Sequence, residues 1–264
     1  MSPQARYHHT GDADLNVPIM TSNADLASDV TDLAEVPEIG DVLRKAGFAS
    51  GDNPGHWVAL NHVAIDLIVA PHQSGRTRSS ARAARLAPHD KHTARIARGL
   101  EPALVDNARA VLESLDSFDS RMVEVRVSGP GALLTAKAIK ISERLGQADR
   151  RPDRSKQKDA LDAFRLFQAI DTTDLVEGFR SHSREEQAAA ASDEALDLYR
   201  QHARSPQGSF AVLATQALKE IRPSRQRLRR WRRNYSLLCV EGSLMSRNGH
   251  QGQGAANVCE GGAS

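Results

Sequence analysis

The stretch HWVALNHVAIDLIVAP, residues 56–71, decides more about the fold than any other part of the sequence. Two runs rich in Val, Ile, Leu and Ala flank Asn61-His62, a pattern typical of two antiparallel strands joined by a tight turn. We therefore expect a hairpin of residues 57–60 and 63–69. Its second strand contains Asp66, whose ionised carboxylate is costly to bury unless it is paired or bound to a cation.

Three explanations for Asp66 are open. Its side chain lies on the solvent side of a half-exposed strand, it pairs with a nearby arginine, or it binds a cation together with other carboxylates. The first two need nothing beyond an ordinary sheet. The third needs a second acidic group on a neighbouring strand.

Such a group is found in RYHHTGDADLNVPI, residues 6–19. Side chains alternate along an extended segment, so Asp12 and Asp14 point the same way, just before an expected strand at residues 15–17. A solvated turn explains two neighbouring carboxylates, and so does a divalent cation that offsets their repulsion. With Asp66, they would form the ligand set of two cations about 3.5–4 Å apart, an arrangement that serves phosphoryl transfer.

Composition sets the broad class of the protein. The 264 residues are 40% hydrophobic and 26% charged, which excludes wholesale disorder, and the net charge of +2 does not by itself indicate a nucleic-acid partner. Cys239 and Cys259 offer no framework for disulfides or zinc. The sequence has neither a leading apolar segment nor an apolar run long enough to span a bilayer, so we expect a cytoplasmic protein and no membrane partner.

Several further elements can be read from residue spacing. VPEIGDVLRKAGF, residues 36–48, predicts a helix that ends at Gly47. Residues 72–98 are rich in arginine and small side chains and predict a mobile loop or an irregular edge. RMVEVRVSGP, residues 121–130, predicts a strand and a turn into a helix.

The helix expected after residue 130 carries an apolar stripe and a basic stripe. Later helices are predicted from KDALDAFRLFQAI, residues 158–170, and at about residues 184–203. Strands first and helices later favour an α+β or α/β core followed by a helical lobe. The apolar stripe consists of Leu134, Ala138, Ile141 and Leu145, and the basic stripe of Lys137, Lys140 and Arg144.

The last sixty residues differ in character. Seven arginines lie between Arg222 and Arg233, and residues 247–264 are polar and Gly-rich, so we expect a disordered tail. Trp231 and Tyr235 among the arginines give the composition of a single-strand binder, although an unstructured basic tail explains it equally well. The expected division is residues 1–126, 127–204 and 205–264.

The order of these motifs resembles the DNA polymerase β-like nucleotidyltransferases and, within them, the AbiEii/AbiGii-type toxins of bacterial toxin–antitoxin systems. The resemblance runs from about residue 6 to about residue 171. It is carried by Thr10, Asp12 and Asp14 as a T-x-D-x-D strand, by LRKAGF, by VAIDLIVAP with Asp66, by VSGPGALLTAKAIKISER with Lys137, and by KQKDALDAFRLF with Lys158, Asp159 and Asp162.

This resemblance implies an α+β fold, a polymerase β-like nucleotidyltransferase mixed sheet with a C-terminal helical lobe. It implies a Mg²⁺-dependent enzyme, a toxin that moves a nucleoside monophosphate from an NTP to a hydroxyl of tRNA, another RNA or a protein, and that has a cognate antitoxin. Asp12 and Asp14 would hold Mg²⁺ against the triphosphate, and Asp66 would complete the second metal site. The nucleotide-binding residues would be Thr10, Lys137, Lys140, Lys158, Asp159 and Asp162.

Plainer interpretations of the same residues stay open. Lys137, Lys140 and Arg144 also fit a solvated helix face, and Lys158 with Asp162 fits a surface ion pair one helical turn apart. Family members carry a strand and a Gly-Gly or Gly-Ser turn ahead of the D-x-D, where this sequence has only eleven residues. We therefore expect either a start further upstream or an inactive remnant that binds nucleic acid or an antitoxin through its basic segments.

Overall fold

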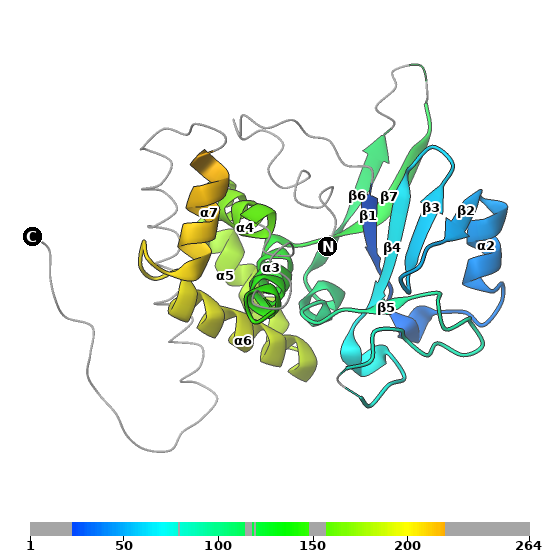
Figure 1. Ribbon diagram of the computed structural model, residues 1–264, viewed down its shortest axis with the longest axis horizontal. Helices are drawn as coiled ribbons and strands as arrows, with labels where there is room; N and C mark the ends of the chain where they lie inside the picture. Colours follow the sequence, from blue (N-terminus) through cyan, green and yellow to red (C-terminus); the bar gives the residue numbers. More distant parts are fainter. Residues whose placement is uncertain (1–22, 79, 114–117, 119, 148–156, 220–264) are drawn as a thin grey trace, which may run out of the picture.

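The computed structural model describes residues 23–78, 80–113, 118, 120–147 and 157–219. The described part is α+β: a mixed sheet with helix α2 (Ile39–Lys45) makes one half, and helices α3 to α7 make the other (Figure 1). The expected α+β class with a mixed sheet and a helical lobe is thus confirmed. None of the helices within these ranges is long and apolar enough to cross a membrane.

The sheet is built around the predicted hairpin. Strand β4 lies between β1, which runs parallel to it, and β3, which runs antiparallel. Strand β2 continues the sheet beyond β3, and the short β5 pairs with the end of β4. The bounds are β1 Asn23–Ala27, β2 Phe48–Ser50, β3 His56–Ala59, β4 Ala64–Val69 and β5 Arg95–Ile96.

The two faces of β4 have different surroundings because its side chains alternate. Leu67 and Val69 pack with Trp57 in a core that also takes up the apolar side of α2. Asp66 and Ile68 point to the opposite face, where Ile68 packs with Ala70 and Leu100. The sequence of β4 is apolar on both sides of Asp66 because both faces of the strand are covered over most of its length.

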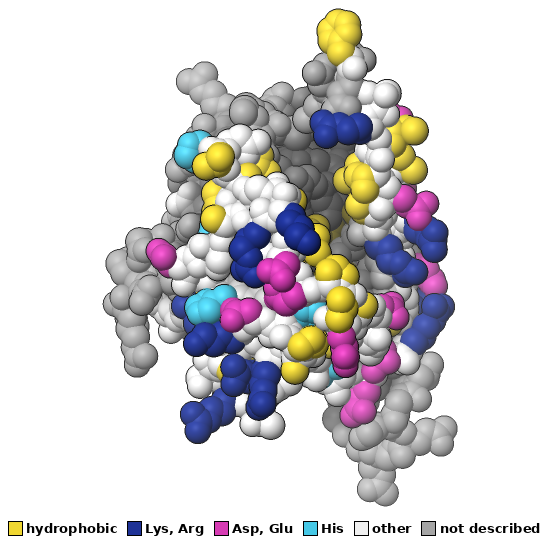
Figure 2. All heavy atoms as spheres, turned by 90° about the vertical axis from the view of Figure 1, so that its right-hand side faces the viewer, with side chains coloured by type: hydrophobic (Ala, Val, Ile, Leu, Met, Phe, Trp, Pro, Cys, Tyr) yellow, Lys and Arg dark blue, Asp and Glu magenta, His cyan; other side chains and the backbone are white. Residues whose placement is uncertain are grey.

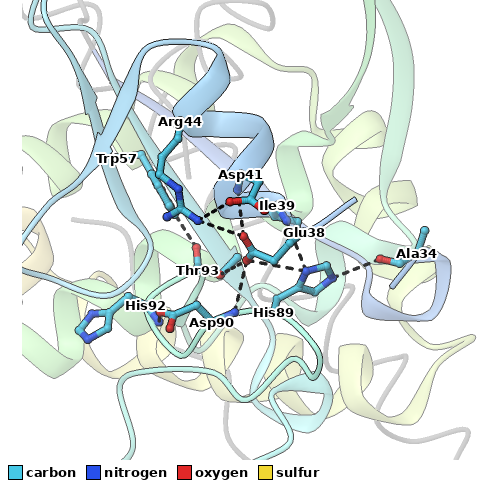
Figure 3. A network of polar contacts seen from close by, with 10 residues as sticks. All are labelled: Ala34, Glu38, Ile39, Asp41, Arg44, Trp57, His89, Asp90, His92 and Thr93. Atoms are coloured by element: carbon cyan, nitrogen blue, oxygen red, sulfur yellow. Dashed lines mark hydrogen bonds and ion pairs between the residues drawn. The ribbon is translucent and has the colours of Figure 1, made fainter. Parts of the chain in front are cut away.

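A polar network ties α2 to the loop beneath it (Figure 3). Glu38 caps α2 by accepting from the backbone N–H of Asp41 at 2.9 Å, and its other oxygen accepts from Asp90 and Thr93 at 3.3 Å. Burial raises the pKa of Glu38, but hydrogen bonds from Gly40, Asp90 and Asp41 outweigh burial and hold the pKa below its ordinary value. The cap therefore works in its ionised form near neutral pH.

His89 belongs to the same network in a defined tautomer. The backbone N–H of Ile39 can only donate, so Nδ1 of His89 accepts from it at 3.4 Å, and Nε2 donates to the carbonyl of Ala34 at 3.2 Å. Trp57 donates to the carbonyl of Thr93 at 3.2 Å. These bonds fix α2 over the Trp57 face of the sheet, opposite the face that carries Asp66.

The helical lobe follows an antiparallel ribbon of β6 (Asn107–Glu113) and β7 (Met122–Ser128). Its helices share one core, which includes Leu134, Ala138 and Ile141 of the expected apolar stripe. The helices predicted from residues 130, 158 and 184 onward are confirmed within a few residues. Their bounds are α3 Pro130–Leu145, α4 Gln157–Ala169, α5 Thr172–His182, α6 Glu186–His202 and α7 Ser209–Lys219.

The expected boundary between residues 204 and 205 is wrong. Helix α7 lies within the predicted tail, yet Phe210, Ala214 and Leu218 are buried in the core of the lobe. Phe210 packs edge-on against Tyr199 with a centroid distance of 5.8 Å. The lobe extends at least to Lys219, and the arginine-rich and Gly-rich parts of the predicted tail lie outside the described residues.

Candidate functional site

Three titratable side chains form a row across the sheet. Asp25 of β1 is the register partner of Asp66 of β4, and Asp66 is in turn the register partner of His56 of β3. Residues directly opposite one another in a sheet share a face. Asn23, two residues before Asp25, shares that face as well. We call Asn23, Asp25, His56 and Asp66 the carboxylate row.

Hydrogen bonds connect the members of the row. His56 Nδ1 lies 2.8 Å from Oδ1 of Asp66, and the amide of Asn23 donates to Oδ2 at 3.0 Å. A weaker bond at 3.4 Å joins the same amide to Asp25. The Asp66 side chain is 18% exposed and that of His56 35%. Asp66 is therefore not a solvent-facing residue. Its carboxylate is bonded to His56 and Asn23, and not to the arginine that was one of the expected partners.

Local backbone structure gives the imidazole its place. Gly51 precedes the turn into β3, and a Cβ atom there would lie 2.8 Å from Cδ2 of His56. The backbone N–H of Gly51 also donates to the carbonyl of His56 at 2.7 Å. A side chain at position 51 would displace the ring, so this glycine leaves His56 free to reach Asp66.

Positive charge reaches the row from two other elements. Burial raises the pKa of the Asp25 carboxyl, but favourable interactions that include the charges of Lys140 on α3 and Arg95 on β5 outweigh burial and hold that pKa below its ordinary value. Arg95 is the register partner of Ile68, which places it on the Asp66 face. Lys140 lies 3.5 Å from Asp159 and is 42% exposed, so its ammonium group is open to solvent. The row thus combines two carboxylates with nearby cations from the helical lobe and from the sheet.

Only part of the expected site can be located. Thr10, Asp12 and Asp14 lie outside the described residues, so their convergence with Asp66 stays a prediction. The residues that the structure places beside Asp66 are Asn23 and Asp25, which sequence reasoning missed. Among the described residues, no group of three or more His, Cys, Asp or Glu side chains is arranged to hold a metal ion.

A signal for these residues was present in the sequence. Residues 21–26, TSNADL, repeat residues 10–15, TGDADL, with Thr, Ala, Asp and Leu at the same positions. Asn23 corresponds to Asp12, and Asp25 corresponds to Asp14. Both copies fit the pattern of a T-x-D-x-D strand, except that the second has the amide Asn23 in place of the first aspartate. The second copy is the one that the structure describes, in β1.

Most of the other expected nucleotide-binding residues belong to a buried ion network between α3 and α4. Lys137 donates to Asp159 at 2.8 Å and to Asp162 at 2.9 Å, and all three side chains are less than a tenth exposed. Arg144 also contacts Asp159. Burial raises the pKa of Asp159, but the charges of Lys137, Lys140 and Arg144 outweigh burial and hold the pKa far below its ordinary value.

This network corrects two interpretations of the sequence. Lys137 does not lie on a solvated helix face, and Asp162 is too buried to form a surface pair with Lys158. Lys137, Asp159 and Asp162 pair with one another within the lobe, and Arg144 adds a second positive charge at Asp159, which favours a packing role over direct contact with a nucleotide. Lys140 and Lys158 remain accessible at the surface.

A second polar cluster joins the ribbon to the lobe. His182 has Nδ1 2.5 Å from the hydroxyl of Ser192 and Nε2 3.2 Å from Asp106, which also accepts from the backbone N–H of Ala132 at 2.8 Å. His182 and Ser192 are buried. A nucleophile must meet its substrate, so this Ser-His-Asp chain is a structural connection at the beginning of α3 and not a hydrolytic site.

Comparison of the chain with protein-family models, with curated proteins and with solved structures found no match in any of the three.

Proposed function

We propose that this protein is a metal-dependent nucleotidyltransferase, the toxin of a toxin–antitoxin pair, that moves a nucleoside monophosphate from an NTP to a hydroxyl group of an RNA or a protein. The observation that carries the proposal is the pairing of Asp25 with Asp66 on adjacent parallel strands, with Lys140 and Arg95 close enough to act on it. The resemblance of the motif order to the nucleotidyltransferase toxins supports the same activity.

The two carboxylates of the row are of the ligand type that a hard divalent cation takes. The two carboxylates supply oxygen ligands, which Mg²⁺ prefers over nitrogen and sulfur, whereas the amide of Asn23 presents its N–H groups to them. Asp25 and Asp66 would hold the ion, and a bound Mg²⁺ neutralises triphosphate charge and favours ionisation of an attacking hydroxyl. Asp12 and Asp14 stay candidates for the same role.

The remaining side chains of the row would orient the carboxylate of Asp66, and nearby cations would neutralise phosphate charge. His56 and Asn23 fix the direction of the Asp66 carboxylate by one hydrogen bond to each of its oxygens. Asp66 would accept the proton of the acceptor hydroxyl. Lys140 and Arg95 would offset charge on the transferred phosphoryl group, a contribution that phosphoryl transfer needs more than covalent chemistry.

One observation favours a second candidate, a non-catalytic protein that binds nucleic acid or an antitoxin. Asn23 occupies the position at which the first copy of the repeat has Asp12. Both oxygens of Asp66 already accept hydrogen bonds from side chains of the row. These bonds stabilise the Asp66 carboxylate without a cation, which is what we would expect in a remnant that no longer binds metal.

Transfer of label from α-phosphate-labelled NTPs to RNA or protein, with Mg²⁺ or Mn²⁺, separates the two candidates. We expect metal-dependent transfer that falls by roughly 10²–10³ in Asp25→Asn and Asp66→Asn, the range seen when electrostatic stabilisation of a transition state is removed. Asp52→Asn is the matched control, because Asp52 is an exposed carboxylate in the turn before β3. Absence of transfer together with metal-independent RNA binding would favour the remnant.

A further inference from the structure

The segment between β4 and β5 is more ordered than its sequence suggests. Its backbone is held at several points: Arg85 donates to Ser74 at 2.7 Å, Ala84 donates to Ala94 at 3.1 Å, and Ile96 donates to Arg82 at 2.8 Å. The side chains of Ala84 and Leu86 are buried in the core under α2. The expectation of a mobile loop or an irregular edge is therefore met only in the second sense: the loop is irregular but anchored.

The basic side chains of this anchored segment point to the surface of the protein. Residues 76–91, which we call the basic loop, contain five basic residues and one acidic residue. All five basic side chains are exposed, and in the part of the chain that the structure describes none of them has an ion-pair partner. Asp90 is already engaged by the backbone N–H of His92 at 2.7 Å. The five residues are Arg76, Arg78, Arg82, Arg85 and Lys91.

The five basic side chains are exposed and follow one another along a single segment. Figure 2 shows one group of Lys and Arg side chains low on the face it draws, at the height at which Figure 1 draws the loop, and further Lys and Arg side chains higher on the same face. Some exposed arginines outside the loop are paired with carboxylates: Arg98 with Glu143 and Glu194, and Arg109 with Glu124. Uncompensated positive charge of this kind attracts polyanions, because binding releases their condensed counterions.

We propose that the basic loop binds the phosphate backbone of a base-paired region of RNA. The loop leads to β5, where Arg95 acts on Asp25 of the carboxylate row. An RNA held along the loop would thus lie beside the face that carries Asp66. That this RNA is the acceptor of the nucleotidyl group rests on the proposed function, whereas the binding itself does not.

The composition of the loop favours RNA over an acidic protein and a duplex over a single strand. Its apolar side chains Ala84 and Leu86 point inward, so it offers no apolar anchor of the kind that protein interfaces use. Residues 74–94 contain no Phe, Tyr or Trp on which an unpaired base could stack. Arginines without aromatic neighbours suit the backbone and shape of a helix, which double-stranded RNA presents to proteins.

The test measures affinity of the full chain for a fluorescent RNA hairpin between 50 and 300 mM KCl (about the range in which phosphate contacts are resolved). The test variant changes Arg78, Arg82, Arg85 and Lys91 to Gln. Each phosphate contact contributes about 0.7–0.9 to the slope of log K against log salt, so we expect the slope to fall by roughly 3 and affinity at 100 mM to fall at least about tenfold. Far-UV circular dichroism checks the fold of each variant.

A matched control removes the same charge elsewhere. Its substitutions to Gln are at Arg109, Arg126, Arg180 and Arg200, which are basic residues of the ribbon and the lobe. We expect the control to keep the slope of the native protein. An equal decrease in both variants, or none in the test variant, would overturn the proposal.

Photo-crosslinking to thiouridine-labelled RNA locates the contact independently. We expect crosslinked peptides from residues 76–91, and crosslinks confined to residues 222–233 would contradict the assignment. Competition by polyglutamate as effective as competition by RNA would assign the surface to an acidic protein instead.

The binding site and the proposed function can fail separately. If Asp66→Asn abolishes label transfer while the loop variant still binds RNA normally, the proposed function stands and the RNA site on the loop is disproved. If the loop variant loses RNA binding in a protein that never transfers label, the RNA site stands and the proposed function is disproved.

Discussion

The side-chain amide of Asn23 donates a hydrogen bond of 3.0 Å to Asp66 across two parallel strands. Replacing Asn23 by Asp turns this attraction into repulsion and places a third carboxylate in the row. We expect Asn23→Asp to lower the free energy of unfolding by about 1–3 kcal/mol without metal. Mg²⁺ should then restore more stability to the variant than it adds to the native protein.

Thermal unfolding with and without Mg²⁺ measures both effects. Asn23→Ala is the control, because it removes the donor without adding charge. A melting temperature of Asn23→Asp that is insensitive to Mg²⁺ would argue against a cation between β1 and β4.

Lys137 holds two buried carboxylates, so its removal should be severe. Lys137→Met leaves Asp159 and Asp162 without their shared ammonium group, and breaking a buried ion network in this way typically costs about 3–5 kcal/mol. Lys140→Met, on the same helix but with a partly exposed side chain, should cost less than about 1 kcal/mol. Urea unfolding of the two variants at pH 7 compares them, and equal effects would show that the network is not the source of stability.

The depressed pKa of Asp159 predicts how stability depends on acid. A carboxyl group whose pKa is lower in the folded state than in the unfolded state stabilises the fold above its unfolded pKa of about 3.9, and that contribution is lost as pH falls toward the folded value. The stability difference between the native protein and Asp159→Asn should therefore be largest near neutral pH and shrink below about pH 4. Denaturant titrations from neutral to acidic pH measure it, and a constant difference would contradict the assignment.

Gly129 leaves space for the side chain that connects the ribbon to the lobe. A Cβ atom at this position would overlap Oδ1 of Asp106. Gly129→Ala should therefore displace Asp106 from α3 and lower the free energy of unfolding by about 3 kcal/mol, the upper end for overpacking. At Gly146, where the nearest atom would be 3.6 Å away, alanine should fit. Calorimetry of both variants tests the difference.

The sequence predicted the elements whose signals are local. The hairpin of β3 and β4 follows from two apolar runs around a polar turn, and α3 and α4 follow from apolar side chains at helical spacing. Helix α7 was missed because Pro206 and Gly208 look like a linker and the arginines after it suggested a tail. Its apolar residues are helically spaced, but their burial depends on the surface that α4 offers.

The site depended on contacts between distant residues, which residue spacing does not reveal. Choosing between residues 10–15 and 21–26 requires knowing which segment pairs with β4. The burial of Lys137 was hidden for a similar reason: on its own helix it continues a basic stripe, and only the carboxylates of α4 make that position an interior one.

Trp57 gives the molecule an optical probe of its own sheet. It is buried under α2, its indole N–H is bound to the carbonyl of Thr93, and the guanidinium of Arg44 lies 6.0 Å from the ring. The only other tryptophan of the chain is Trp231. Replacing Trp231 by Phe would leave a single emitter in an apolar, hydrogen-bonded setting, so that the wavelength of its fluorescence reports whether α2 is seated on the opposite side of the sheet from Asp66.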